Sequence, residues 1–147
     1  MTFQAELLRG CREAMGNFHQ RWTGTRLTLF EPTRRSWQLQ CGEGRFDVRR
    51  RNAAYAKRSG VALNFEIRGS EDLVAGYSFC VAWVAAGWTL MFHRDPARAA
   101  WPAHPEHHLQ VDGPEASTQR PPFVDWRIPF GETKPERLLE YIASRIT

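Results

Sequence analysis

Two apolar segments separated by a very short connection constrain the fold of this chain more than any other feature. They cover residues 77–84 and 88–93, and only Ala85, Ala86 and Gly87 separate them. Alternate residues of an extended chain lie on opposite faces, and both faces of the first segment are apolar. A strand that is apolar on both faces is typical of the centre of a covered sheet. The pattern therefore predicts two strands, with the first of them at the centre of the sheet.

Shorter segments on either side alternate between apolar and polar residues, as half-buried strands do. Residues 26–41 contain two such segments around a turn at Pro32, which predicts a β-hairpin. The basic stretch 49–60 fits either a loop or a short helix that ends at Gly60. The same alternation predicts three further strands, at residues 45–49, 61–67 and 107–112.

Both ends of the chain carry the periodicity of amphipathic helices. Between residues 3 and 22, apolar residues recur at steps of three and four, which predicts a helix over this range. Near the other end, Thr133 and Glu136 fit a capping box with Pro135 in the first turn, so a second helix is expected at about 135–146. Together these elements predict an α+β fold, with a single curved, mostly antiparallel sheet of about six strands and the N- and C-terminal helices packed on one face.

Length and composition fit one domain that spans residues 1–147. A chain of 147 residues with 42% hydrophobic and 24% charged residues can bury a single core. The three cysteines are far apart and fit neither a disulfide framework nor a metal-ligand spacing. No segment has the pattern of a signal peptide or of a membrane span. These features predict a cytoplasmic protein that has no membrane partner.

Positive charge is concentrated in one segment, although the net charge of the whole chain is only +4. Residues 34–58 contain eight basic and two acidic residues, with aromatic residues between them. Arginine pairs with phosphate and stacks on bases. The alternative is a solvated basic edge strand that prevents edge-to-edge pairing. The segment predicts contact with RNA through Arg45, Arg49, Arg50, Arg51, Lys57 and Arg58.

Four of the five histidines lie within a stretch of sixteen residues. His93, Arg94 and Asp95 close one predicted strand, and His107 and His108 open the next. If the end of the first strand lies beside the start of the second, these side chains meet at one rim of the sheet. Imidazoles can serve as acid and base on a ribonucleotide, and an arginine can stabilise the phosphorane. We therefore predict a catalytic site of His93, Arg94, Asp95, His107 and His108.

Alternation within residues 107–112 separates the last two histidines. His107 shares a face with Leu109 and Val111, whereas His108 shares the opposite face with Gln110. We therefore expect His107 to be packed and His108 to be the more available of the two.

Two other interpretations of this histidine-rich stretch remain open. Its polar residues can simply close a loop over the end of the sheet. His104 and His108 also have a chelating spacing, which Asp95 or Asp112 could complete, although Pro105 disfavours the helical His-x3-His arrangement. The chain has no nucleotide-binding loop and no serine-hydrolase motif. We predict neither a metal nor any other cofactor.

The stretch HRDP…HPEHHLQVDG…ERLLEYI, within residues 76–142, resembles the small bacterial toxins known as TumE-like proteins over about half of the chain. In that family, two strands end in a turn that contains Arg and Asp, and a His-rich segment and a terminal helix follow. The N-terminal half of the chain lies outside the resemblance. The resemblance implies a toxin of a toxin–antitoxin pair that a partner protein neutralises, and it directs attention to Arg94, Asp95, His107 and His108.

These features lead to one functional hypothesis and one alternative. The first is a small cytoplasmic protein of a toxin–antitoxin or defence type that acts on RNA as a metal-independent ribonuclease. In this hypothesis His93 or His108 is the acid or base, Arg94 stabilises the phosphate, and residues 45–58 contact the nucleic acid. The alternative is a non-catalytic module that binds nucleic acid or a protein partner, such as an antitoxin or a subunit of a complex.

Overall fold

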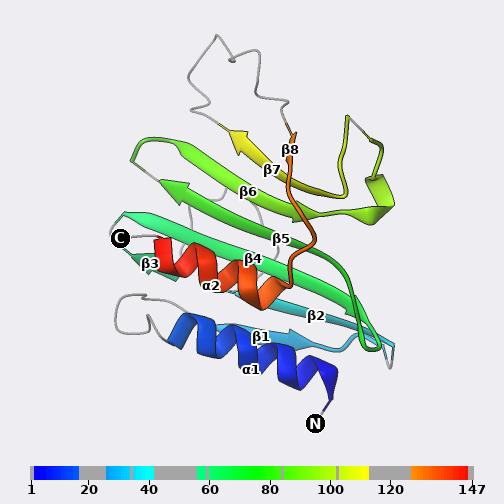
Figure 1. Ribbon diagram of the computed structural model, residues 1–147. Coiled ribbons are helices and arrows are strands. Elements are labelled where there is room, and N and C mark those ends of the chain that lie inside the picture. Colours follow the sequence, from blue (N-terminus) through cyan, green and yellow to red (C-terminus); the bar gives the residue numbers. More distant parts are fainter. Residues whose placement is uncertain are drawn as a thin grey trace.

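The computed structural model describes residues 2–16, 26–33, 35–41, 56–58, 60–83, 85–101, 103–112 and 127–145. Within these ranges the chain forms two helices, one short 3-10 helix and one sheet (Figure 1). The elements in chain order are α1 (Phe3–Gly16), β1 (Leu27–Phe30), β2 (Ser36–Cys41), β3 (Ala56–Arg58), β4 (Val61–Ser70), β5 (Leu73–Trp83), β6 (Trp88–Arg94), η2 (Pro96–Arg98), β7 (His107–Asp112), β8 (Arg127–Pro129) and α2 (Pro135–Arg145).

The sheet is an antiparallel meander. Its strand order is β1-β2-β4-β5-β6-β7-β8, and β3 pairs with β4 beside this path. β3 pairs with residues 61–63 of β4, with Arg58 opposite Val61. β2 pairs with residues 65–70 of the same strand. Figure 1 shows α1 and α2 side by side on one face of the sheet. The predicted α+β class is therefore confirmed, with a sheet slightly larger than about six strands.

The face of the sheet beneath the two helices forms the hydrophobic core. Leu63 and Phe65 of β4 and Phe79 of β5 are fully buried, as is Leu139 of α2. The rings of Phe65 and Phe79 stack with their centroids 5.1 Å apart. Burial of a side chain of this size contributes about 1.5–3 kcal/mol. This face therefore holds both terminal helices on the sheet.

The opposite face of the sheet carries the buried polar side chains, beside the buried Ala62 and Cys80. Gln40, Asn64, Thr89 and His108 are the buried polar residues of the described part of the chain. All four occupy strand positions that alternate with those of the core. Because side chains alternate along a strand, the sheet separates an apolar layer from a polar one. The candidate site residues divide between these two layers.

Several local predictions are confirmed by the strand pairing. Residues 26–41 form the β1–β2 hairpin, with Leu29 opposite Leu39. The regular alternation of residues 61–67 falls within β4, and the two apolar segments form the paired strands β5 and β6. β5 lies in the middle of the strand order. Among the described residues, no helix has the length and apolar composition that crossing a membrane requires.

Other local predictions need correction or lie outside the described residues. Residues 56–58 form a strand, whereas a loop or a helix was expected, because their backbone pairs with β4 before a turn at Gly60 with φ of 77°. The three-residue strand β8 was not predicted, since so short a segment carries no alternation. The predicted strand at 45–49 and the end of the first helix at 17–22 lie outside the described residues.

Candidate functional site at one end of the sheet

The predicted site residues meet where β6 ends and β7 begins. In the antiparallel pairing, His93 lies opposite His108 and Arg94 lies opposite His107. The Asp95 amide donates to the Glu106 carbonyl oxygen at 2.9 Å, which continues the ladder beyond the two strands. Neighbouring residues point to opposite faces. The five predicted residues therefore share one rim but do not form one cluster.

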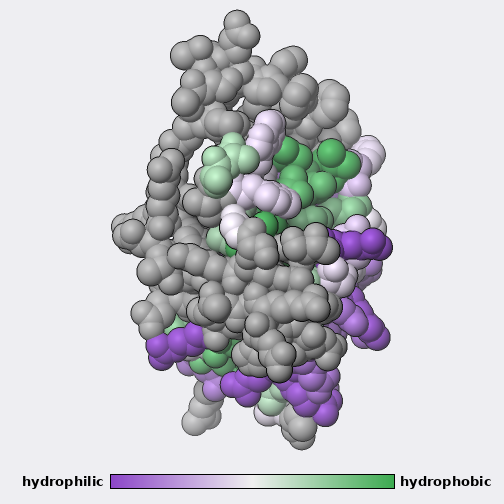
Figure 2. All heavy atoms as spheres, turned by 90° about the vertical axis from the view of Figure 1, so that its left-hand side faces the viewer, coloured by the Kyte–Doolittle hydropathy of each residue, from purple (hydrophilic) through white to green (hydrophobic). Residues whose placement is uncertain are grey.

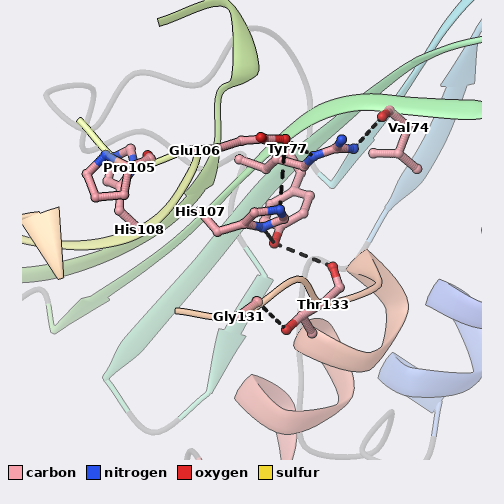
Figure 3. Close-up of polar contacts among 9 residues, drawn as sticks. Val74, Tyr77, Pro105, Glu106, His107, His108, Gly131 and Thr133 are labelled. Carbon is pink, nitrogen blue, oxygen red and sulfur yellow. Dashed lines mark hydrogen bonds and ion pairs between the residues drawn. The ribbon is translucent and has the colours of Figure 1, made fainter. Parts of the chain in front are cut away.

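Four side chains form what we call the helix-side cluster: Tyr77, Arg94, Glu106 and His107. Nε of Arg94 donates to Oε1 of Glu106 at 3.1 Å, and Nη1 of Arg94 donates to the Val74 carbonyl oxygen at 2.5 Å. The Tyr77 hydroxyl lies 3.2 Å from Nδ1 of His107, and Nε2 of His107 lies 4.0 Å from Oε1 of Glu106. Figure 3 shows Tyr77, Glu106 and His107 converging above the start of α2, with His108 well apart from them.

The segment that leads into α2 holds His107 from the other side. The Phe130 amide donates to the His107 carbonyl oxygen at 3.2 Å, and the two rings meet edge to face with centroids 5.7 Å apart. The Tyr77 hydroxyl donates to the Thr133 carbonyl oxygen at 3.5 Å. We assign the Tyr77 proton to this carbonyl, which leaves the Tyr77 oxygen to accept from Nδ1–H of His107. Nε2 is then the basic nitrogen of His107, on the side of Glu106.

Electrostatics keep both hydrogen-bonded groups of this cluster neutral near pH 7. Burial lowers the pKa of His107 below its ordinary value of 6.5, and the neighbouring Arg94 lowers it further, against the opposite effect of Glu106 and Glu132. Burial also raises the pKa of Tyr77 to about 12, although Arg94 opposes this rise. The side chain of Glu106 is 41% exposed and that of Arg94 is 25% exposed. The cluster therefore combines a neutral base, a carboxylate and a guanidinium that solvent reaches.

The lowered pKa of His107 predicts how stability depends on pH. Between the folded pKa and the unfolded value of about 6.5, the unfolded chain binds more protons, so folding is disfavoured as pH falls. The contribution of His107 is complete above about pH 6.5 and is lost as pH falls through the folded pKa. We expect a lower urea midpoint at about pH 5.5 than at about pH 7.5, and a smaller difference in His107→Gln. An equal difference in both proteins would contradict this assignment.

Three rings on the polar face form what we call the imidazole cluster: His93, His104 and His108. The rings of His93 and His108 stack with centroids 5.1 Å apart, and His104 meets His108 edge to face at 4.6 Å. Nδ1 of His108 lies 2.8 Å from the Pro105 carbonyl oxygen, and because a carbonyl only accepts, this nitrogen carries the proton. Nδ1 of His104 and the hydroxyl of Ser78, which pairs with His93, are buried and have no hydrogen-bond partner among the described residues.

The exposure of the two adjacent histidines is the reverse of what the sequence predicts. His108 is only 2% exposed, whereas the side chain of His107 is 12% exposed. The expected division of the two rings between opposite faces is found, but His108 is the more deeply packed of the two. It is buried because two other imidazoles, His93 and His104, lie against it.

Arg94 and the imidazole cluster point to opposite faces of the sheet, so Arg94 does not lie beside a phosphate held at His93 or His108. Asp95 instead pairs with Arg98, with 3.7 Å between its Oδ2 and Nε of Arg98. Within the described ranges, no group of three or more His, Cys, Asp or Glu residues is arranged to hold a metal ion.

The basic segment that predicts contact with RNA cannot be placed beside these clusters. Arg45, Arg49, Arg50 and Arg51 lie outside the described residues, and of Lys57 and Arg58 only the backbone in β3 is described. Their role in binding nucleic acid stays a prediction.

Two members of the helix-side cluster, Tyr77 and Glu106, were not predicted as site residues. Tyr77 belongs to the apolar segment 77–84 and there resembles a core residue. Its pairing with Arg94 in the β5–β6 register brings its hydroxyl to the rim. Glu106 precedes His107 directly, and this adjacency is the one signal in the sequence that points to it.

Comparison with known proteins adds no relative to this description, because no protein-family model, curated protein or solved structure matches the chain.

Proposed function

We propose that this protein cleaves RNA without a metal ion, as a small cytoplasmic protein of the toxin–antitoxin or defence type. The observation that carries the proposal is the helix-side cluster, in which Oε1 of Glu106 lies 3.1 Å from Nε of Arg94 and 4.0 Å from Nε2 of His107. When a 2′-hydroxyl attacks phosphorus, the reaction requires a base, a carboxylate and a guanidinium. The imidazole cluster is less suited to this reaction, because His108 is 2% exposed and Arg94 points to the other face.

Each side chain has one role in the proposed reaction. Nε2 of neutral His107 takes the proton of the 2′-hydroxyl while the 2′-oxygen bonds to phosphorus, and Glu106 stabilises the imidazolium that forms. Arg94 stabilises the phosphorane, since its guanidinium has five N–H donors and the two bonds above use two of them. The bond from phosphorus to the 5′-oxygen then breaks. The 5′-oxygen takes a proton from water, to which His107 later returns the proton it accepted.

The toxin–antitoxin part of the proposal rests on the resemblance of residues 76–142 to TumE-like toxins. A protein partner that neutralises the activity would then be an antitoxin. Cys11, Cys41 and Cys80 are buried free thiols, which suits the reducing cytoplasm in which RNA is found.

The proposal predicts RNA cleavage that survives removal of metal ions. We expect the purified protein to cut RNA equally with and without EDTA, and to leave 2′,3′-cyclic phosphate and 5′-hydroxyl ends. Arg137→Ala is a matched control because Arg137 is an exposed arginine of α2 that pairs only with Glu140 among the described residues, and it should cut at the wild-type rate. An absence of cleavage, or its loss in EDTA, would overturn the proposal.

The same experiment has a cellular arm. Induced expression in a bacterium should arrest growth, and Arg137→Ala should arrest growth equally. Growth that continues while purified protein cleaves RNA would remove the toxin assignment and leave the ribonuclease.

An exposed apolar surface favours the alternative, a non-catalytic module that docks a protein partner. Trp83, Trp88 and Ile128 are 37%, 41% and 46% exposed, on the strands at the β5–β8 side of the sheet. Figure 2 shows hydrophobic residues gathered together on one part of the surface. Exposed apolar patches mark interaction sites in soluble proteins. Capture of a protein partner without any cleavage of RNA would select this alternative.

A further inference from the structure

Trp101 is the most exposed large hydrophobic side chain of the described residues, at 76%. It lies in the connection between β6 and β7. This connection begins at Asp95, next to Arg94 of the helix-side cluster, and ends at Glu106, which belongs to that cluster. A single exposed hydrophobic residue is ordinary on a protein surface. Trp101 differs from such a residue in two respects, which are its position on the connection and the hydrogen bonds of the surrounding backbone.

Hydrogen bonds close the turn that carries Trp101. The Ala100 amide donates to the His104 carbonyl oxygen at 2.7 Å, and the His104 amide donates back to the Ala100 carbonyl oxygen at 2.6 Å. The Asp95–Glu106 bond closes the same connection at its base. These bonds hold the described residues on both sides of the turn, which reduces the entropic cost of a contact made by the indole.

The described residues that flank Trp101 in the chain are small, since Ala99, Ala100 and Ala103 are all exposed alanines. Within the connection, Arg98 is 80% exposed, and His104 belongs to the imidazole cluster. A protein-docking patch requires further large apolar side chains around its aromatic residue, and the described residues of the connection contain none besides Trp101. The exposed pair Trp83 and Trp88 lies at the other end of β6 and cannot supply them.

The length of the connection also limits the distance between Trp101 and the reacting groups. Glu106 follows Trp101 by five positions, which bounds the distance along the chain at about 18 Å. A strand of RNA whose scissile phosphate lies on Arg94 can therefore extend toward Trp101 by a few nucleotides. An aromatic face stacks on bases of any sequence, but only when those bases are unpaired.

We propose that Trp101 is a stacking platform for an unpaired base, and that the substrate of this protein is single-stranded RNA. This inference rests on the proposed function and adds to it the class of RNA. Trp101 binds substrate and takes no part in the chemical step. Its removal therefore acts on KM and leaves kcat unchanged.

Binding of a labelled single-stranded oligonucleotide, with 2′-O-methyl groups to prevent cleavage, tests the inference directly. Stacking on one aromatic ring is worth about 1–3 kcal/mol, so Trp101→Ala should weaken binding about 5- to 150-fold. Trp101→Phe should restore most of the affinity. The control is Tyr141→Ala, which removes an exposed aromatic residue from α2 and should bind as the wild type does. A duplex of the same sequence should bind no more tightly than the Trp101→Ala variant binds the single strand.

The outcomes separate this inference from the proposed function. If Trp101→Ala binds as tightly as the wild type, or if the duplex binds as tightly as the single strand, the platform is overturned and the ribonuclease stands. If the wild type binds the single strand through Trp101 but cleaves no RNA, the inference holds as a binding site and the ribonuclease is overturned. If the wild type neither binds nor cleaves RNA, both are overturned.

Discussion

Replacing His107 by alanine is expected to lower the rate of RNA cleavage by about 10²- to 10⁴-fold, the usual contribution of a positioned base. The loss follows from removing Nε2, the nitrogen that takes the 2′-hydroxyl proton, while Arg94 and Glu106 remain in place. The measurement is single-turnover cleavage of a short RNA, which isolates the chemical step from binding. The residual rate reflects stabilisation of the phosphorane by Arg94 alone.

His107 also packs against Phe130 and contacts Tyr77, so alanine could reduce folding as well as catalysis. His107→Gln separates the two effects, because a glutamine amide can donate to the Tyr77 hydroxyl but cannot serve as a base. We expect His107→Gln to be as inactive as alanine and to unfold at nearly the wild-type denaturant midpoint. Activity of His107→Gln near the wild-type rate would remove the base from the mechanism.

His93→Ala is the matched variant on the other face of the sheet. His93 lies one residue from Arg94 but points into the imidazole cluster, so its loss should leave the chemical step near the wild-type rate. The sequence favours His93 or His108 as the acid or base, and this pair of variants decides between the two faces. A loss in His93→Ala that equals the loss in His107→Ala would move the site to the imidazole cluster.

The alternation of side chains explains how much of the fold can be predicted from the sequence. Residues 61–67 alternate regularly between apolar and polar side chains, whereas residues 77–84 are apolar on both faces. Both patterns place a strand near the centre of the sheet, and Phe65 and Phe79 are indeed fully buried there. Short elements such as β3 and β8 have too few residues for a period to be visible, and pairing with a neighbour determines them. Local pattern therefore predicts the centre of the sheet better than its margins.

The sequence predicts where the candidate site lies, but it does not predict which of its side chains contact one another. His93, Arg94, His107 and His108 were expected at one rim, and the rim is where they lie. Which of them act together depends on the register between β6 and β7, and the connection of residues 95–106 sets that register. A shift of one residue exchanges every side chain between the two faces. For the same reason the burial of His108 could not be predicted, since it depends on rings from two other segments.

Gly69→Ala is expected to be the most destabilising small substitution in the sheet, at roughly 3 kcal/mol, the upper end of the range for overpacking a core. Gly69 lies opposite Trp37 in the β2–β4 pairing, and the indole lies flat across it. A Cβ atom added to Gly69 would lie 1.9 Å from Cζ2 and 2.1 Å from Cε2 of Trp37, which no packing permits. The ring must move, although it is only 2% exposed.

Displacement of the Trp37 ring carries further costs. Its Nε1 donates to the Glu71 carbonyl oxygen at 2.8 Å, and the ring packs on Phe3 of α1 with centroids 5.9 Å apart. A buried indole N–H that loses its acceptor adds about 1–3 kcal/mol, and the loss of contact with Phe3 loosens α1. Urea unfolding should show a lower midpoint with an unchanged m-value, while residual RNA cleavage by the folded fraction should keep its kcat.

A control and a compensating variant test the cause of this effect. Gly131→Ala adds the same methyl group where a Cβ meets nothing within 4 Å, so it should leave stability within about 0.5 kcal/mol of the wild type. Trp37→Leu costs stability alone, but it vacates the space above Gly69, so Gly69→Ala should cost far less in that background. The two substitutions are therefore expected to be strongly non-additive in a double-mutant cycle. Additive effects would show that the strain at Gly69 arises from the backbone of β4 and not from the indole that lies across it.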